Sequence, residues 1–175
     1  MYLPTHKTAT LCYVLWTNKT EGMDELLLLY RNKKENDFHE GKYVPVGGRL
    51  EPGETPLECV IREVKEEAGY QLTPSDVTFR GYVYFDEINR DLVRNEDIPG
   101  FNIIVFVYTA RITSKIVINN PEGELKWFRF DKIPYGRMWE GDKIFTPKIL
   151  ETDDIIELKF LYEGQKVIKW GLGRL

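Results

Sequence analysis

The sequence predicts a layered α/β/α domain, in which a β-sheet is packed between helices. Two observations favour this class: strand-like segments recur along the chain, and two segments with helical spacing are interleaved with them. A third is size, because 175 residues, 42% of them hydrophobic, can bury a substantial core. No internal repeat, low-complexity tract or linker interrupts the sequence. We therefore expect one domain covering residues 1–175.

Three strands are expected before the first helix, because each is a short, largely apolar run bounded by turn or loop residues. They cover residues 8–17, 25–30 and 42–46. A turn at 18–24 joins the first two, and a polar loop at 36–41 precedes the third. Positive charge gathers after the second strand, where Arg31 and Lys33 are either solvated loop residues or contacts for substrate phosphates.

The first helix is expected at 56–68, because both of its ends carry boundary signals. Thr55 is a suitable N-cap, Pro56 suits the first helical position, and Glu58 completes a capping box. Gly69 is a natural C-terminal stop. The residues that recur at helical spacing, and that we expect to be buried, are Leu57, Val60, Ile61, Val64 and Ala68.

A second face of this helix carries three acidic residues, Glu63, Glu66 and Glu67. Like charges three and four residues apart repel each other, although a solvated charged face is the ordinary explanation. Here a glycine-rich loop with another acid, Glu54, precedes the helix, and Arg62 adds a single positive charge. The net negative cluster would suit a hard divalent cation such as Mg2+, which binds carboxylate, carbonyl and water oxygens.

The loop and helix together carry one motif: Gly48, five residues, Glu54, seven residues, then Arg62-Glu63-Val64-x-Glu66-Glu67-x-Gly69. This pattern resembles the signature of the Nudix hydrolases at every fixed position, and so many positions at fixed spacing are highly specific. The last position is usually aliphatic and is Tyr70 here. The resemblance implies a Nudix-type α/β/α sandwich, with a mixed central sheet between helices and the motif helix on one side.

The resemblance also implies roles in metal-assisted hydrolysis of a phosphoanhydride. The motif ligands for Mg2+, which Mn2+ can replace, would be Gly47, through its carbonyl, Glu63, Glu66 and Glu67. Arg62 would orient the glutamates, and Glu54 would fix the loop or the attacking water. The family usually adds one acid from outside the motif. Glu122 and Glu124 are the alternatives, and spacing to the following tryptophans favours Glu122, unless this is an ordinary solvated turn.

The second half of the chain supplies further strands and one more helix. The strands are expected at 77–85, 101–111, 124–130, 155–162 and 167–170. The apolar run at 101–111 should be central, and a strand at 116–118 is marginal. The helix is expected at 139–151, with Pro147 near its start. Its apolar face would consist of Ile144, Phe145, Ile149 and Leu150. The charged segment 86–100 is expected to be a mobile loop near the substrate.

The stretch from Trp127 to Asp142 extends the resemblance to MutT-type purine nucleoside triphosphate diphosphatases, particularly those that remove oxidised purines. In these enzymes the second tryptophan and the acid after it line the base pocket. Trp139 would therefore stack on a purine, unless it is a core residue, and Asp142 would hydrogen-bond the purine edge. Phe38 and Phe145 fit as further pocket walls.

Two positions depart from that pattern. Some of these enzymes have a second acid where this chain has Gly141, and some have an asparagine where residues 43–46 have none. The leading hypothesis is a Mg2+-dependent hydrolase that cleaves a nucleoside triphosphate, such as 8-oxo-dGTP or a related purine dNTP, to a monophosphate and pyrophosphate. A pyrophosphatase for ADP-ribose or a dinucleoside polyphosphate is the alternative. A non-catalytic Nudix module is third, and the intact motif acids argue against it.

The composition of the chain indicates which class of partner it binds and in which cellular compartment we expect it. The net charge of −4 provides no basic surface for a nucleic-acid polymer, so we expect a small nucleotide as substrate. No signal-peptide pattern and no run of about 18 apolar residues is found, and a cytoplasmic protein that contacts no membrane is expected. Cys12 and Cys59 are expected to be reduced packing residues. Either a monomer or a homodimer is compatible with the sequence.

Overall fold

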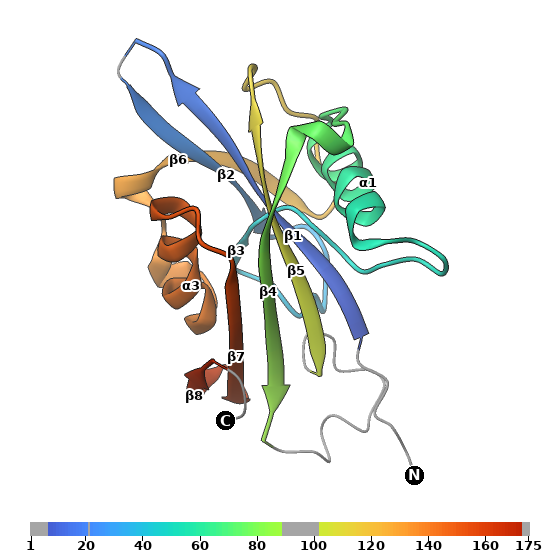
Figure 1. Ribbon diagram of the computed structural model, residues 1–175, viewed down its shortest axis with the longest axis vertical. Helices are drawn as coiled ribbons and strands as arrows, with labels where there is room; N and C mark the ends of the chain where they lie inside the picture. The colour runs from blue at the N-terminus through green and yellow to red at the C-terminus, as the bar shows by residue number, and fades with distance from the viewer. Residues whose placement is uncertain (1–6, 21, 89–101, 173–175) are drawn as a thin grey trace.

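The computed structural model describes residues 7–20, 22–88 and 102–172, and in these one β-sheet lies between two helices. Helix α1 (Pro56–Ala68) covers one face of the sheet, and helix α3 (Glu140–Glu151) covers the other (Figure 1). The predicted α/β/α sandwich is therefore confirmed.

The sheet is mixed, as the motif resemblance implied. Its strands are β1 (Lys7–Asn18), β2 (Met23–Arg31), β3 (Tyr43–Val44), β4 (Val77–Glu87), β5 (Ile103–Ile112), β6 (Gly123–Arg129), β7 (Ile156–Glu163) and β8 (Lys166–Gly171). Within the described residues the order is β3-β2-β1-β5-β4-β7-β8, and β6 pairs with β2. β1 runs parallel to β5 and β4 parallel to β7, whereas the other neighbours are antiparallel. Short 3-10 turns lie at Pro74–Asp76, Phe130–Lys132 and Tyr135–Arg137.

The predicted strands and helices lie close to their expected bounds, with one exception. β5 is an interior strand between β1 and β4, as its apolar run indicated. The prediction of a marginal strand at 116–118 is wrong. These residues form no strand, and the side chain of Ile116 is 83% exposed. In the segment predicted to be a mobile loop, residues 86–87 continue β4, and residues 89–100 lie outside the described part of the chain.

Helix α1 begins and ends where its sequence signals indicate. The Thr55 hydroxyl accepts a hydrogen bond from the Glu58 amide, and the Glu58 carboxylate accepts one from the Thr55 amide, which completes the capping box. Gly69 ends the helix in the left-handed conformation, at φ 85°. The predicted stripe is fully buried at Val60, Val64 and Ala68, and half-buried at its other positions.

Strand β1 contributes side chains to the cores on both faces of the sheet, because successive residues of a strand point to opposite sides. Tyr13 packs with Phe145 in the core beneath α3. Cys12 and Val14 pack with Val60 in the core beneath α1. Both cysteines of the chain are buried and free, in agreement with the expected packing role. β1 thus fixes both helices relative to the sheet.

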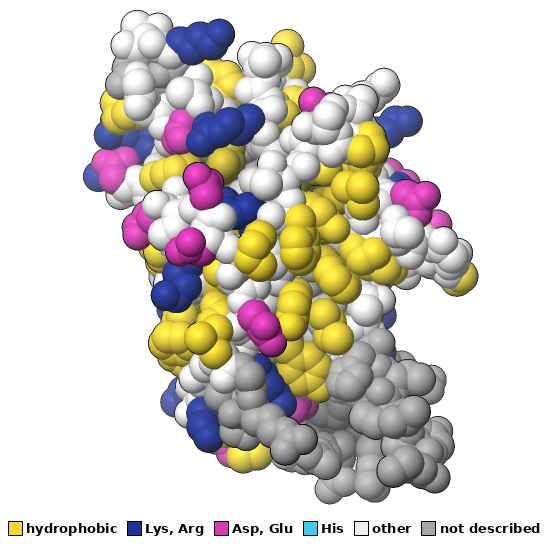
Figure 2. Space-filling model, in the orientation of Figure 1, with side chains coloured by type: hydrophobic (Ala, Val, Ile, Leu, Met, Phe, Trp, Pro, Cys, Tyr) yellow, Lys and Arg dark blue, Asp and Glu magenta, His cyan; other side chains and the backbone are white. Residues whose placement is uncertain are grey.

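Part of the sheet carries partly exposed hydrophobic side chains. Figure 2 shows such side chains gathered over the middle of the molecule, where Figure 1 draws β4 and β5. On these strands Phe79 is 40% exposed and packs against Phe106 and Tyr108. Neither helix of the described residues combines the length and the apolar character that crossing a membrane would need.

Candidate active site

One cavity of about 570 Å³ brings together the acidic and the aromatic residues singled out in the sequence. Its acidic lining includes Glu63, Glu67 and Glu122, and its aromatic lining includes Phe38, Trp139 and Tyr162. These groups come from α1, the segment before β6, the loop after β2, the start of α3, and β7. A single ligand of nucleotide size could therefore contact both groups.

Two glycines bring the motif loop against β1 and α1. A Cβ added at Gly47 would overlap the carbonyl oxygen of Thr10, and one added at Gly48 would overlap the carboxylate of Glu63. The carbonyls flanking Gly47 are occupied, since Cys12 N donates to Val46 O at 2.7 Å and Thr10 N donates to Gly48 O at 2.8 Å. Within the described residues, no hydrogen bond reaches the Gly47 carbonyl.

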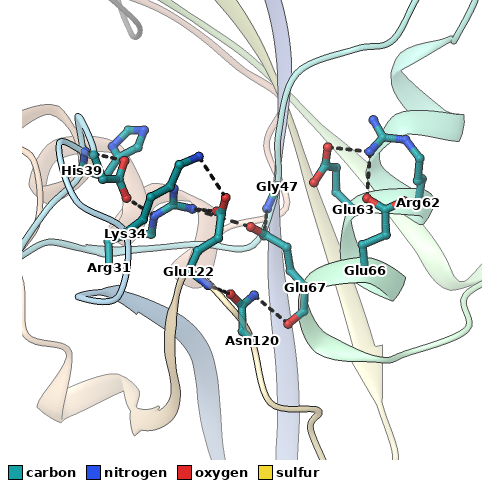
Figure 3. Close-up of polar contacts among 11 residues, drawn as sticks. Arg31, Lys34, His39, Gly47, Arg62, Glu63, Glu66, Glu67, Asn120 and Glu122 are labelled. Atoms are coloured by element: carbon teal, nitrogen blue, oxygen red, sulfur yellow. Dashed lines mark hydrogen bonds and ion pairs between the residues drawn. The ribbon is translucent and has the colours of Figure 1, made fainter.

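Arg62 is held between the acids of the motif. Its guanidinium donates to both carboxylate oxygens of Glu54, at 2.8 and 2.9 Å, to Glu63 at 2.7 Å and to Glu66 at 3.1 Å. These bonds lower the pKa of Glu54 to about 2, so this carboxylate stays ionised. Figure 3 shows the contacts of Arg62 with Glu63 and Glu66, and a role of Arg62 in orienting the glutamates stays a prediction.

Glu67 is a largely enclosed acid of the motif. Its side chain is 12% exposed, and its carboxylate accepts a hydrogen bond from Gly47 N at 2.9 Å. Burial raises the pKa of Glu67 to about 8, against the lowering effect of that hydrogen bond. Asn120 donates to the carbonyl of Glu67 at 3.0 Å and accepts from the amide of Glu122 at 2.7 Å. Asn120 thereby fixes the distance between two of the acidic segments.

Strand pairing places Glu122 beside this helix. β6 pairs with β2 up to the match of Gly123 with Arg31, so that Glu122 follows directly beyond the pair. The Glu122 carboxylate contacts the Arg31 guanidinium and lies 3.4 Å from Lys34 Nζ (Figure 3). Glu124 instead faces Lys126 and Asn32 on the exposed surface. Of the two acids considered in the sequence, Glu122 is the one that lines the cavity.

The guanidinium of Arg31 is already paired with carboxylates and is not exposed as a free binding group for phosphate. Its side chain is 11% exposed and is surrounded by three carboxylates: Asp37, 2.5 Å away, Glu67, 3.8 Å away, and Glu122. Lys33, the other cation considered for this role, donates to Asn119 and to the carbonyl of Asn120. Arg31 therefore neutralises the acidic lining and ties it to the loop after β2.

The oxygen atoms that line the cavity are of the kind that binds a divalent cation. In this structure, however, the acidic side chains lie apart from one another. No three acidic, histidine or cysteine side chains of the described residues are grouped closely enough to hold a metal ion. The cause is visible in the contacts: Arg62 occupies the space between Glu63 and Glu66, and Arg31 binds Glu122. The carboxylates of Glu63, Glu67 and Glu122, with the Gly47 carbonyl, offer the hard oxygen ligands that Mg2+ prefers.

The aromatic lining centres on Trp139, which is the N-cap residue of α3. Phe38 stacks on its indole, with ring centroids 4.8 Å apart and planes 14° apart. The indole Nε1 donates to Nδ1 of His39 at 2.9 Å, and Lys42 Nζ lies 5.1 Å from the ring centroid. Trp139 is only 8% exposed. The indole thus packs in the core, as one sequence alternative held, and it also lines the cavity. Stacking on a purine, the other alternative, stays a prediction.

Asp142 is buried in the same cavity, at 4% exposure. Burial raises the pKa of Asp142 to about 7, partly offset by a hydrogen bond from the Trp139 amide. The adjacent amide of Gly141 donates to the hydroxyl of Tyr162 at 2.9 Å. A Cβ at position 141 would overlap that hydroxyl region, so Tyr162 fills the space that a larger residue would need.

Four of the predicted site residues do not line the cavity: Glu54 and Arg62, which bind each other, and also Phe145 and Glu66. Phe145 is fully buried and packs edge-on against Tyr13, so its position favours a core residue over a pocket wall. Glu66 has a side chain that is 59% exposed and contacts Arg62. The sequence reasoning missed His39 and Tyr162, which do line the cavity. Their only sequence signals were a polar loop beside Phe38 and an apolar strand, and neither pattern distinguishes a site residue.

Comparison with known proteins identifies one domain family and two related hydrolases or phosphatases. Residues 5–149 match the model of the NUDIX domain family. An oxidized purine nucleoside triphosphate hydrolase of Danio rerio is 27% identical over 135 residues, which cover 77% of this chain and 79% of that protein. The 8-oxo-dGDP phosphatase NUDT18 of Homo sapiens is 39% identical over 136 residues, which cover 75% of this chain and 36% of the human protein.

A solved structure supports the fold alone. The MutT protein from Bacillus halodurans superposes with a TM-score of 0.71 at 24% identity, covering 94% of this chain and 96% of that one. Its strand and helix arrangement is that of the sandwich described above.

Proposed function

The chain belongs to the Nudix family, and from that premise we propose that it is a Mg2+-dependent hydrolase that cleaves a purine nucleoside triphosphate to a monophosphate and pyrophosphate. The observation that carries this proposal is the shared cavity, in which Glu63, Glu67 and Glu122 lie in the same space as Trp139 and Asp142. Acidic groups that can hold a cation suit the phosphates, and a flat aromatic wall with one buried acid suits a purine.

The residues have distinct parts in the proposed reaction. Glu63, Glu67, Glu122 and the Gly47 carbonyl would hold the divalent cation, which supplies charge neutralisation and polarisation of phosphate and water oxygens when bound. Arg62 fixes the orientation of the motif acids through charge-assisted hydrogen bonds. Such positioning is the main contribution a protein makes to phosphoryl transfer.

The relatives favour an oxidised purine as substrate and leave the number of phosphates open. The fish relative is named for a triphosphate and the human relative for 8-oxo-dGDP, a diphosphate. A pyrophosphatase acting on ADP-ribose or a dinucleoside polyphosphate remains the alternative. Product analysis on 8-oxo-dGTP, dGTP, 8-oxo-dGDP, ADP-ribose and a dinucleoside tetraphosphate, with and without chelator, separates these activities. Preferred cleavage of ADP-ribose would contradict the proposal.

The metal role is tested by Glu67→Gln. We expect kcat to fall by roughly a hundredfold or more, because the variant loses a ligand charge worth several kcal/mol to the transition state. Glu124→Gln is the matched control, since Glu124 is an exposed acid outside the cavity. Steady-state kinetics at saturating Mg2+ provide the measurement. Near wild-type turnover of Glu67→Gln would remove this residue from the ligand set.

A further inference from the structure

His39 is held by its neighbours in a defined hydrogen-bonding state. Its Nδ1 accepts the indole hydrogen of Trp139 at 2.9 Å, and its amide donates to Asp37 at 3.1 Å. A nitrogen that accepts a hydrogen bond carries no proton, so a neutral imidazole in this position must carry its proton on Nε2. Trp139 therefore sets the tautomer of His39.

The surroundings of His39 favour the neutral ring. The side chain is half-buried, and it lies near the charges of Arg31, Asp37, Glu122 and Arg49. Burial is the largest influence and the arginines add to it, so that the pKa of His39 is lowered to about 4 against the opposing effect of the two acids. At neutral pH the ring is thus a donor at Nε2 and an acceptor at Nδ1.

The Nε2 hydrogen is available to a ligand. Within the described residues Nε2 makes no hydrogen bond, whereas Nδ1 is taken. Among those residues Arg80 Nε is the single enclosed side-chain nitrogen or oxygen without a partner, so Nε2 of His39 is open to solvent. His39 lines the cavity, and its ring lies edge-on to the stacked pair, 5.1 Å from Phe38 and 5.9 Å from Trp139 between ring centroids.

From these contacts we propose that His39 is a specificity-determining residue that donates Nε2–H to a carbonyl oxygen of the purine. The proposal rests on the proposed function, because it assumes a purine nucleotide in this cavity. A neutral donor pairs with an acceptor such as the 6-oxo group of guanine. It opposes the 6-amino group of adenine, which is itself a donor. A site built to donate one hydrogen bond rejects a ligand that cannot accept it.

The tautomer is tested without reference to activity. The chain has two histidines, so imidazole 15N NMR yields two sets of signals, and His6→Gln assigns them. We expect the Nε2–H tautomer for His39, with signals unchanged between pH 8 and pH 5.5. Trp139→Phe should move the ring toward the tautomer mixture of a free histidine, in which the Nδ1–H form is also populated, because it removes the indole donor. An Nδ1–H tautomer in the wild type, or titration of His39 near pH 6.5, would overturn the proposal.

Specificity is tested with two matched variants. His39→Asn places an amide near the Nδ1 position and keeps a partner for Trp139, but it removes the Nε2 donor. His39→Gln reaches the Nε2 position with an amide donor. We expect the ratio of kcat/KM for dGTP over dATP to fall roughly tenfold in His39→Asn, and to be partly restored in His39→Gln. An unchanged ratio in a His39→Asn variant that melts like the wild type overturns the role of His39.

The two proposals fail in different ways. If the wild type hydrolyses no purine nucleotide, the proposed function fails. The role of His39 is then decided by titrating dGMP and dAMP against the 15N-labelled protein. A selective shift of the Nε2–H signal with dGMP supports the donor role, and equal or absent shifts with both nucleotides contradict it.

Discussion

At the scale of single residues, Asp142 is a buried acid that lines the candidate site. It is buried beside Trp139, whose amide it binds, and its pKa is raised to about 7 from an ordinary value of 3.8. Between these pH values the folded protein holds a proton that the unfolded chain has released. The free energy of unfolding should therefore fall as the pH rises from about 4 to about 7, by at most about 1.4 kcal/mol per unit from this group.

Asp142→Asn should abolish this fall in the free energy of unfolding with rising pH, because an amide does not ionise. We expect the variant to be more stable than the wild type at pH 8, by up to a few kcal/mol, and the difference to disappear near pH 4. Urea unfolding from pH 4 to pH 8 measures this. Asp131→Asn is the control, since Asp131 is an exposed partner of Arg129. A constant difference between Asp142→Asn and wild type across the range would show that Asp142 is ionised throughout.

At the scale of elements, the turn from Gly47 to Gly48 determines where α1 presents its acids. The three atoms nearest to a Cβ at residue 48 all belong to the flexible end of Glu63, so Gly48→Ala should fold while displacing that carboxylate. We expect kcat to fall at least tenfold, with a change in melting temperature of a few degrees or less. Gly136→Ala is the control, because a Cβ there meets nothing within 4 Å. Full activity of Gly48→Ala would contradict close placement of Glu63.

The boundaries of helices and strands could be predicted where the residues that determine them lie close by in the sequence. The boundaries of α1 follow from Thr55, Pro56 and Gly69, which act within one turn of each end. The contact of Arg31 with Glu122 follows from the pairing of β2 with β6, and these segments are far apart in the sequence. No periodicity of one segment specifies its partner strand. The sequence therefore indicated both residues as site candidates but gave no sign that Arg31 would be occupied by carboxylates.

The fold of the chain was predicted more completely than the cavity around Trp139, because the cavity depends on contacts between distant segments. A motif of fixed spacing identifies the loop and helix that carry Glu63 and Glu67, whatever the rest of the chain does. The pocket around Trp139 depends on the loop after β2 and on Tyr162 of β7, which meet α3 only after the sheet has formed. The family resemblance suggested Phe145 as a pocket wall, whereas its helical spacing placed it on the apolar face of the helix, which packs in the core.

At the scale of the whole molecule, binding of a cation by the folded chain should raise its stability. Three acids and two arginines share one region, and the net charge of −4 adds a mild attraction for cations. A ligand that binds only the folded state stabilises it by about 2.7 kcal/mol at a hundredfold excess over Kd. For a chain of this length, that corresponds to a rise in melting temperature of roughly 5–11 °C.

We therefore expect Mg2+ or Mn2+ to raise the melting temperature of the wild type, and chelator to reverse the rise. Glu67→Gln and Glu122→Gln should each reduce the shift, because each removes an oxygen ligand from the cavity. Without metal, Glu67→Gln should leave the melting temperature nearly unchanged at neutral pH, because burial already keeps this carboxyl largely protonated. Glu124→Gln should behave as the wild type does. A metal-induced shift that survives in both cavity variants would place the cation elsewhere, and the loss of turnover in Glu67→Gln would then need a cause other than metal binding.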